Sequence, residues 1–268
     1  MSYMLLDTRT MILAQRNGLT VRLALTPEDI REAQRLRYRV FYEELSALPD
    51  AVAKASRLDV DRFDSFCDHL LVLQDDAPDD EKFVGTYRLL RQDVADKNGG
   101  FYAQSEFDVE PLLQRHSGLK FLEVGRSCVA MGFRGKPVAE LLWQGIWNYV
   151  RFHKLDVMLG CASLAGTNAN SLADELTFLA NIKPAHQDWT VSALPHRQVD
   201  MQRKPMADVN QKAVIRSLPT LVKAYLRLGC YIGDGAVIDH QFNTTDVLIV
   251  LPVSEINPRY FNHYGAPV

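Results

Sequence analysis

The longest strand pattern in the sequence, residues 119–131, is followed directly by a turn and by an apolar helix that begins at Pro137. Proline suits the first turn of a helix, where its missing N–H would have no partner. Further strand patterns cover residues 19–25, 69–73, 82–90, 157–162, 236–239 and 246–253, and helical patterns begin after Thr26 and cover residues 137–153, 168–180 and 218–228. Strands followed by helices predict a single α/β domain over residues 1–268 with a mixed sheet. We expect the weakly patterned residues 183–217 to form an insertion or a lid.

Charge and composition exclude several classes of protein. The 30 basic and 33 acidic residues give a formal net charge of −3, which argues against nucleic-acid binding through bulk charge. The apolar runs are of strand length, far short of the ~20 residues that cross a bilayer. Neither the histidines nor the four widely separated cysteines have the spacing of a metal or redox motif. We therefore expect a cytoplasmic protein without a metal or a nucleic-acid partner, and we expect any contact with the inner membrane surface to be peripheral.

Several charged residues interrupt patterns that are otherwise apolar. Arg88 lies near the end of one strand pattern, Glu123 and Arg126 lie within another, and Arg37 shares a helix face with Phe41. Burying a charge is costly unless the charge is paired, so we expect these residues to pair across neighbouring elements. Such a group either holds the sheet together as a salt-bridge network or forms a polar functional site.

The turn before Pro137 contains two cations, Arg134 and Lys136. The start of a helix offers free N–H groups and the positive end of the helix dipole, which together favour an anion. This turn is therefore either an anion-binding site or an ordinary junction with two solvated cations.

The same turn resembles the coenzyme A loop of the Gcn5-related N-acetyltransferases, whose pattern is Arg/Gln-x-x-Gly-x-Gly/Ala. Arg134 and Ala139 fit this pattern, whereas Pro137 replaces a glycine and removes a backbone donor. The resemblance implies a mixed, mostly antiparallel sheet flanked by helices. A donor carried on the phosphopantetheine of acyl carrier protein would tolerate the lost N–H better than coenzyme A. The residues implied to bind the donor are Val129, Met131, Arg134, Gly135, Lys136 and Ala139.

Four upstream segments resemble the acyl-homoserine-lactone synthases, which have a related fold. The acceptor side of those synthases has the pattern Arg…Phe, Asp-x-x-Asp, Arg and Glu-x-x-Arg, and this chain matches it in order. The matching residues are Arg37, Phe41, Asp61, Asp64, Arg88, Glu123 and Arg126. Residues 45–48 stand where those synthases carry a tryptophan, so lactone synthesis is a weaker alternative.

The fuller match, across nearly the whole chain, is to the bacterial ornithine-lipid acyltransferases. It includes the segments Phe66-Cys67-Asp68-His69-Leu70, Val124-Gly125-Arg126-Ser127-Cys128, Leu142-Trp143-Gln144-Gly145-Ile146 and Gly160-Cys161-Ala162-Ser163. This resemblance implies transfer of a 3-hydroxyacyl group from acyl carrier protein to the α-amine of L-ornithine, which yields lyso-ornithine lipid. Acylation of glycine or lysine, and a lipid- or carrier-binding module without chemistry, stay open as alternatives.

The family resemblance also implies roles for the site residues. We expect Glu123 to accept a proton from the acceptor amine, with Asp64 as the second choice. Arg126 would orient Glu123 or bind the acceptor carboxylate, and Asp61 and Asp64 would bind the δ-ammonium. Backbone N–H groups at the end of the strand would stabilise the oxyanion, and no bound cofactor is needed. The remaining substrate-binding residues are Arg37, Phe41, Arg88 and Ser127.

Residues 196–227 are rich in basic side chains. The cations are Arg197, Arg203, Lys204, Lys212, Arg216, Lys223 and Arg227, and the acids are Asp200 and Asp208. Acyl carrier protein and inner-leaflet lipids are both acidic, so either would be attracted to such a face. A solvated surface without a partner is the simpler alternative.

Overall fold

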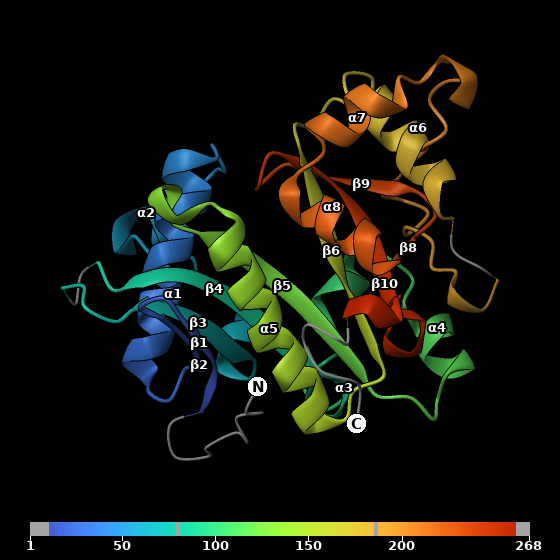
Figure 1. The fold of residues 1–268 in the computed structure, drawn as a ribbon. Helices are drawn as coiled ribbons and strands as arrows, with labels where there is room; N and C mark the ends of the chain where they lie inside the picture. The colour runs from blue at the N-terminus through green and yellow to red at the C-terminus, as the bar shows by residue number, and fades with distance from the viewer. Residues whose placement is uncertain (1–10, 79–80, 185–186, 261–268) are drawn as a thin grey trace.

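The computed structural model describes residues 11–78, 81–184 and 187–260, and its strands form one continuous sheet (Figure 1). The described strands are β1 (Ile12–Arg16), β2 (Leu19–Leu23), β3 (Asp68–Gln74), β4 (Phe83–Arg91), β5 (Phe121–Val129), β6 (Val157–Ala165), β7 (Gln198–Val199), β8 (Tyr231–Ile232), β9 (Ala236–Asp239) and β10 (Thr244–Pro252). Their order is β1-β2-β3-β4-β5-β6-β10-β9-β7, and β8 pairs with β10. Every neighbouring pair is antiparallel except β5 and β6, which run parallel. The predicted mixed, mostly antiparallel sheet is confirmed.

The helices begin where local sequence signals place them. The described helices are α1 (Pro27–Tyr38), α2 (Ala51–Ser56), α3 (Gln92–Ala95), α4 (Glu110–Arg115), α5 (Lys136–His153), α6 (Ala173–Ile182), α7 (Gln211–Ser217) and α8 (Thr220–Leu228). Thr26 caps α1 and forms a capping box with Asp29, and Pro27 occupies the first turn. α1 continues into a π-helical turn, Arg39–Glu44, which the sequence pattern does not reveal. α5 begins one residue before Pro137, close to its predicted start.

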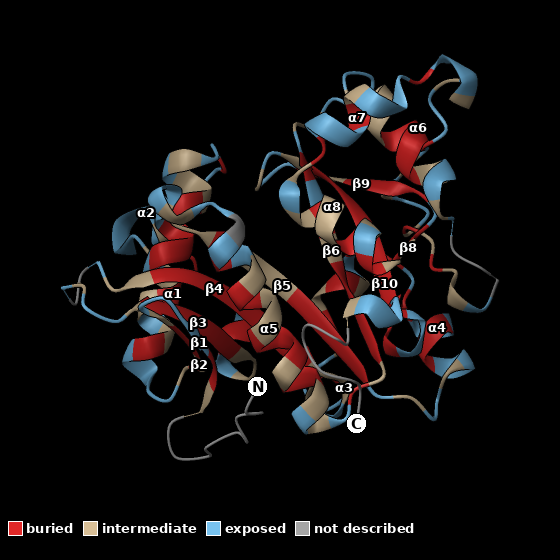
Figure 2. Cartoon of the chain, in the orientation of Figure 1, coloured by how far each residue is buried: buried red, intermediate tan, exposed pale blue. Residues whose placement is uncertain are grey.

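Helices cover both faces of the sheet. α5 packs on β1–β4 and α8 packs on β6 and β10, and the two helices share one hydrophobic core that includes Trp147 and Tyr225. On the opposite face, Ala33 of α1 packs with Leu71 of β3, and the segment from α3 to α4 contributes Phe107 to a second core. Figure 2 shows that the central strands are buried along most of their length. The sheet is therefore the rigid centre on which the site is built.

β5 and β6 lie side by side only at their beginnings. Their register runs from Phe121–Val157 to Glu123–Leu159 and then ends. At Gly160 the backbone of β6 lies so close to β5 that a Cβ at this position would lie 2.2 Å from the carbonyl oxygen of Val124. Beyond this point the two strands separate, and the sheet opens between them (Figure 1). The separation leaves one edge of β5 without a β6 partner beyond Glu123.

Some predicted elements differ from the structure. The helix predicted at residues 168–180 begins only at Ala173, because the Asn168 side chain accepts hydrogen bonds from the N–H groups of Asn170 and Ser171 and stabilises a turn. Residues 183–217 include β7 and α7, and β7 extends the sheet beside β9. The strands β1, β7 and β8 have no counterpart in the prediction. Within the described ranges, no helix combines the length and apolar character needed to cross a membrane.

Candidate active site

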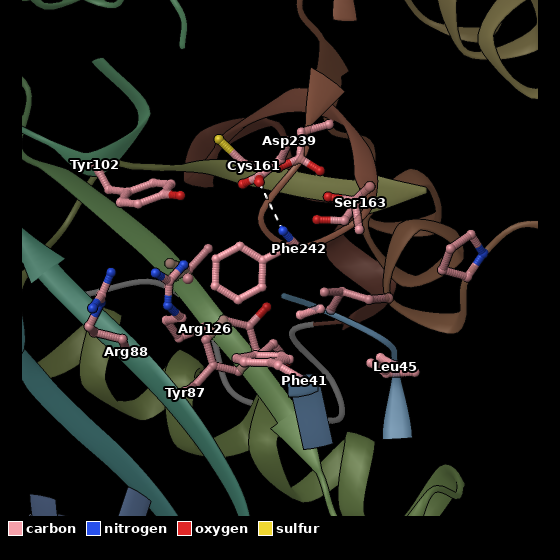
Figure 3. Close-up of a pocket in the computed structure, with 18 of the residues that line it drawn as sticks. Phe41, Leu45, Tyr87, Arg88, Tyr102, Arg126, Cys161, Ser163, Asp239 and Phe242 are labelled. Carbon is pink, nitrogen blue, oxygen red and sulfur yellow. Dashed lines mark hydrogen bonds between the residues drawn. The ribbon is translucent and has the colours of Figure 1, made fainter. Parts of the chain in front are cut away.

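A cavity of about 440 Å³ opens where β5 and β6 separate. The lining residues on which its chemistry depends are Phe41 from the π-helical turn, Arg88 from β4, Glu123, Arg126 and Ser127 from β5, and Asp246 from β10. Figure 3 shows Arg88, Tyr102 and Arg126 on one side of the cavity and Ser163 and Asp239 on the other. Five of the predicted site residues therefore meet at the split in the sheet: Phe41, Arg88, Glu123, Arg126 and Ser127.

Glu123 is held on the cavity wall by backbone groups. Its Oε1 accepts a hydrogen bond from the N–H of Ala103 at 2.7 Å, and its Oε2 accepts one from the N–H of Tyr102 at 2.8 Å. Burial raises the pKa of Glu123 to about 6, although the two N–H groups and the nearby Arg88 and Arg126 act to lower it. A carboxylate with a pKa near neutrality is suited to accept a proton at physiological pH.

Arg126 reaches the cavity because of a bulge in β5. The pairing of β4 with β5 passes from Thr86–Cys128 to Arg88–Gly125, so β5 contains one extra residue, and Arg126 adopts a left-handed backbone conformation with φ 49°. Its guanidinium lies over the rings of Tyr102 and Phe242, 5.0 and 4.6 Å from their centroids. Burial acts to lower the pKa of Arg126, but its acidic neighbours, Asp59 first among them, raise it above the ordinary value. Arg126 therefore stays charged.

Three arginines and three aspartates form a closed ring of ion pairs beside the cavity. Each arginine contacts two aspartates, and each aspartate contacts two arginines, over N–O distances of 2.6–3.3 Å. In order around the ring, the members are Arg37, Asp59, Arg126, Asp61, Arg88 and Asp64. The charges balance, so each buried charge has an opposite charge beside it, and the ion pairs fix the guanidinium groups of Arg88 and Arg126 against the cavity.

The ring changes two of the predicted roles. Asp64 accepts hydrogen bonds from Arg37 through both oxygens, at 2.8 and 2.6 Å, and does not line the cavity. Against the effect of burial, Arg37 and Arg88 hold the pKa of Asp64 well below its ordinary value, which makes it a weak proton acceptor. Arg126 is bound to Asp59 and Asp61, and the hydrogen bonds that orient Glu123 come from the backbone instead. The expectation that Arg126 orients Glu123 is therefore replaced by orientation from Tyr102 and Ala103.

The predicted donor-binding residues lie at the junction of β5 and α5. These residues are Val129, Met131, Arg134, Gly135, Lys136 and Ala139. Arg134 donates to the carbonyl oxygen of Val129 at 3.0 Å and forms an ion pair with Glu44. Gly135 is the N-cap of α5 and has no side chain to cap the helix, and the side chain of Lys136 lies outside the described part of the chain. The junction offers the N–H groups of a helix start to an anion, with Arg134 already bound to an acid.

Several residues of the site carry weak sequence signals. Asp59 is a lone acid between Leu58 and Val60, and Tyr102 and Ala103 contribute only backbone N–H groups.

Three further acids, Glu106, Asp239 and Asp246, have carboxylate oxygens within 4.8 Å of one another, the spacing of a cation site. The thiol of Cys161 also lines the cavity, but burial raises its pKa well above the ordinary value and disfavours the thiolate.

Comparisons with known proteins agree with this fold. The family model of the acetyltransferase (GNAT) domain matches residues 36–144. Curated relatives from Brucella abortus (strain 2308) and Rhizobium meliloti (strain 1021) are 48% and 47% identical over 257 residues, and both are named L-ornithine N(alpha)-acyltransferase. The matches cover 95% of this chain and 92% and 87% of the two relatives.

A solved structure has a similar fold. It is an N-acyl amino acid synthase from uncultured soil microbes, 12% identical, with a TM-score of 0.50 over 91% of this chain and 97% of that chain. At this identity the likeness concerns the fold alone. The extent and identity of the curated relatives, together with the domain match, show that this chain is an acyltransferase with a GNAT fold and belongs to the L-ornithine N(alpha)-acyltransferase family.

Proposed function

We propose that this protein transfers a 3-hydroxyacyl group from acyl carrier protein to the α-amine of L-ornithine, and that the product is lyso-ornithine lipid. The names of the relatives support ornithine as the acceptor. The observation that carries the chemistry is the position of Glu123, a buried carboxylate on the cavity wall with a pKa of about 6. It is the proton acceptor that an amine needs before it can attack a thioester.

The acceptor is bound through its carboxylate. Arg126 lines the cavity and is held in one place by Asp59 and Asp61, so its guanidinium can meet the α-carboxylate without a large loss of side-chain freedom. Arg88, on the neighbouring strand, adds a second positive charge at the same wall. In this proposal the α-ammonium of the bound acceptor lies near Glu123, which lines the same cavity.

The reaction then proceeds in two steps. The α-ammonium gives one proton to Glu123, directly or through water, and the nitrogen attacks the thioester carbonyl carbon as the N–C bond forms. N–H groups on the free edge of β5 donate to the oxyanion. The intermediate collapses, the C=O bond re-forms, the C–S bond breaks, and the nitrogen loses its second proton to the departing phosphopantetheine thiolate. Glu123 releases its proton to solvent, so no bound cofactor takes part.

The donor approaches from the side of α5 and α7. Pro137 leaves one N–H fewer at the start of α5, which weakens a site for the pyrophosphate of coenzyme A. Lys212 and Arg216 are exposed one turn apart on α7 and can attract the acidic acyl carrier protein.

We place the protein in the cytoplasm, in peripheral contact with the inner membrane surface, where an acylated product would leave.

The test is an incubation of the purified protein with 3-hydroxyacyl-loaded carrier protein and one amino acid at a time. Mass spectrometry should detect N-acylated ornithine, and glycine and lysine should give much less product. A parallel reaction with the coenzyme A thioester should have a much lower kcat/KM. A product only with glycine or lysine, a lactone product, or no acyl transfer with any amino acid would contradict the proposal.

A further inference from the structure

Glu106, Asp239 and Asp246 form a second charged group beside the cavity. Their relative exposures are 1%, 8% and 5%, and their carboxylate oxygens lie within 4.8 Å of one another. Asp239 and Asp246 line the cavity, and the Cys161 thiol, also on the cavity wall, donates a hydrogen bond to Glu106 at 3.4 Å. Arg197 lies 3.6 Å from Glu106. Three acids and one arginine leave an excess of negative charge at this wall, unlike the balanced ring on the other side.

Asp246 has an oxygen that the folded chain does not satisfy. Its Oδ1 is buried and makes no hydrogen bond within the described residues, and the side chains whose hydrogen bonding stabilises this carboxylate are the neutral hydroxyl groups of Ser163 and Thr244. Burial raises the pKa of Asp246 to about 6 and that of Glu106 to about 7, and the mutual repulsion of these acids contributes to the shift of Glu106. A buried carboxylate oxygen without a donor is costly, so this arrangement indicates a ligand that brings positive charge and N–H donors.

The acidic group lies next to the proposed acceptor site. Phe242 connects the two: its ring packs against the Arg126 guanidinium at 4.6 Å, and its N–H donates to Oδ1 of Asp239 at 2.9 Å (Figure 3). An amino acid whose carboxylate is bound by Arg126 can therefore extend its side chain along Phe242 towards Asp239 and Asp246.

We propose that Asp246, Asp239 and Glu106 bind the side-chain ammonium of a diamino-acid acceptor and thereby select it over neutral amino acids. This inference rests on the proposed function. It replaces the expectation that Asp61 and Asp64 bind the ammonium, because both are committed to the ion-pair ring. An ammonium supplies three donors and one positive charge, which suits a cluster with an unsatisfied oxygen.

The test compares L-ornithine with L-norvaline, which has the same carbon chain without the δ-amine. We expect the wild-type protein to favour ornithine by about 10²-fold in kcat/KM or more. Asp246→Asn and Glu106→Gln should each lower kcat/KM for ornithine by roughly 10–100-fold, mainly through KM, and thereby reduce the ratio of the ornithine value to the norvaline value by a similar factor. Asp234→Asn, which alters an exposed acid on the turn before β9, is the matched control and should change neither value.

Three results would overturn the inference. The first is an unchanged preference for ornithine in both variants, with melting temperatures near that of the wild type. The second is loss of turnover in EDTA that Mg²⁺ restores, which would assign the acids to a metal. The third is equal binding of ornithine and norvaline, measured by titration calorimetry. This measurement is needed if the wild type acylates neither amino acid, because the proposed function then fails while the subsite can still be tested. Tighter binding of ornithine that Asp246→Asn abolishes would support the subsite.

Discussion

The carboxylate of Glu123 accepts a 2.7 Å hydrogen bond from the backbone N–H of Ala103, 20 positions earlier in the chain. With the second bond, from Tyr102, this contact fixes both oxygens without a positively charged side chain. The arginines beside Glu123 are instead bound to aspartates of the ring. The site therefore separates a proton acceptor of raised pKa from a charge-balanced ring that positions Arg88 and Arg126.

The ring should contribute strongly to stability. Arg37→Leu would leave Asp59 and Asp64 buried beside one another with less positive charge, and removing one partner of a buried pair costs about 3–5 kcal/mol. The free energy of unfolding, measured by urea denaturation, should fall by about this amount. Arg39→Leu, an exposed arginine two positions later, should change it by less than about 0.5 kcal/mol. Equal effects of the two substitutions would show that the ring is not what holds α1 to the sheet.

The point where β5 and β6 part should not accept a side chain. In Gly160→Ala the new Cβ would lie 2.2 Å from the carbonyl oxygen of Val124, which directly follows Glu123. Overpacking of this kind costs about 1–3 kcal/mol, and we expect both the melting temperature and kcat to fall. Gly118→Ala is the control, because no atom lies within 4 Å of its added Cβ. A Gly160→Ala protein that melts and turns over like the wild type would contradict the proposed close approach.

The charges on α7 should affect the carrier protein more than the amino acid. Changing both Lys212 and Arg216 to Glu should raise the KM for acyl carrier protein by about tenfold at low salt, and the difference should shrink as salt screens the charges. The KM for ornithine should stay the same. Lys97→Glu with Lys120→Glu is the matched control, since both lysines are exposed, Lys97 follows α3 by two residues, and Lys120 directly precedes β5, which contacts α3. Figure 1 shows α3 at the opposite end of the molecule from α7. Unchanged steady-state kinetics in the α7 variant would remove α7 from the donor surface.

Much of this site could be predicted because its side chains interrupt apolar patterns. Arg88 and Glu123 lie in strands whose other residues are mostly buried, so their burial and pairing follow from the local sequence. The closed ring could not be predicted, because it depends on the order of the strands and on the bulge at Arg126. Tyr102 and Ala103 act through backbone N–H groups, which every residue but proline possesses.

The acidic group formed by Glu106, Asp239 and Asp246 could not be predicted from the sequence for a different reason. Asp239 and Asp246 lie in β9 and β10, which the sequence shows only as a closing hairpin. Glu106 belongs to a segment between two short helical turns with no strand or helix pattern of its own. Their proximity arises from tertiary packing alone, and it appears only when the positions of all three carboxylates are known.

The rate should depend on the protonation of Glu123. Its pKa of about 6 lies above the ordinary value of 4.5, so the carboxylate is ionised and able to accept a proton above pH 6 and is progressively protonated below it. We expect kcat/KM to fall with decreasing pH through a limb near pH 6. The limb near pH 6 should be absent from the residual activity of Glu123→Gln. Its persistence there would assign it to another group.

The most direct measurement is the turnover of Glu123→Gln at pH 8, with its melting temperature taken on the same samples. The amide keeps the shape of the side chain and one hydrogen-bond acceptor. It loses the hydrogen bond to one of the two backbone N–H groups, but it also removes a buried negative charge. The two effects oppose each other, so the melting temperature should stay within a few degrees of the wild type. If Glu123 accepts the proton of the amine, kcat should fall by about 10²–10⁴-fold. A folded Glu123→Gln protein that acylates ornithine at a near-native rate would contradict the account.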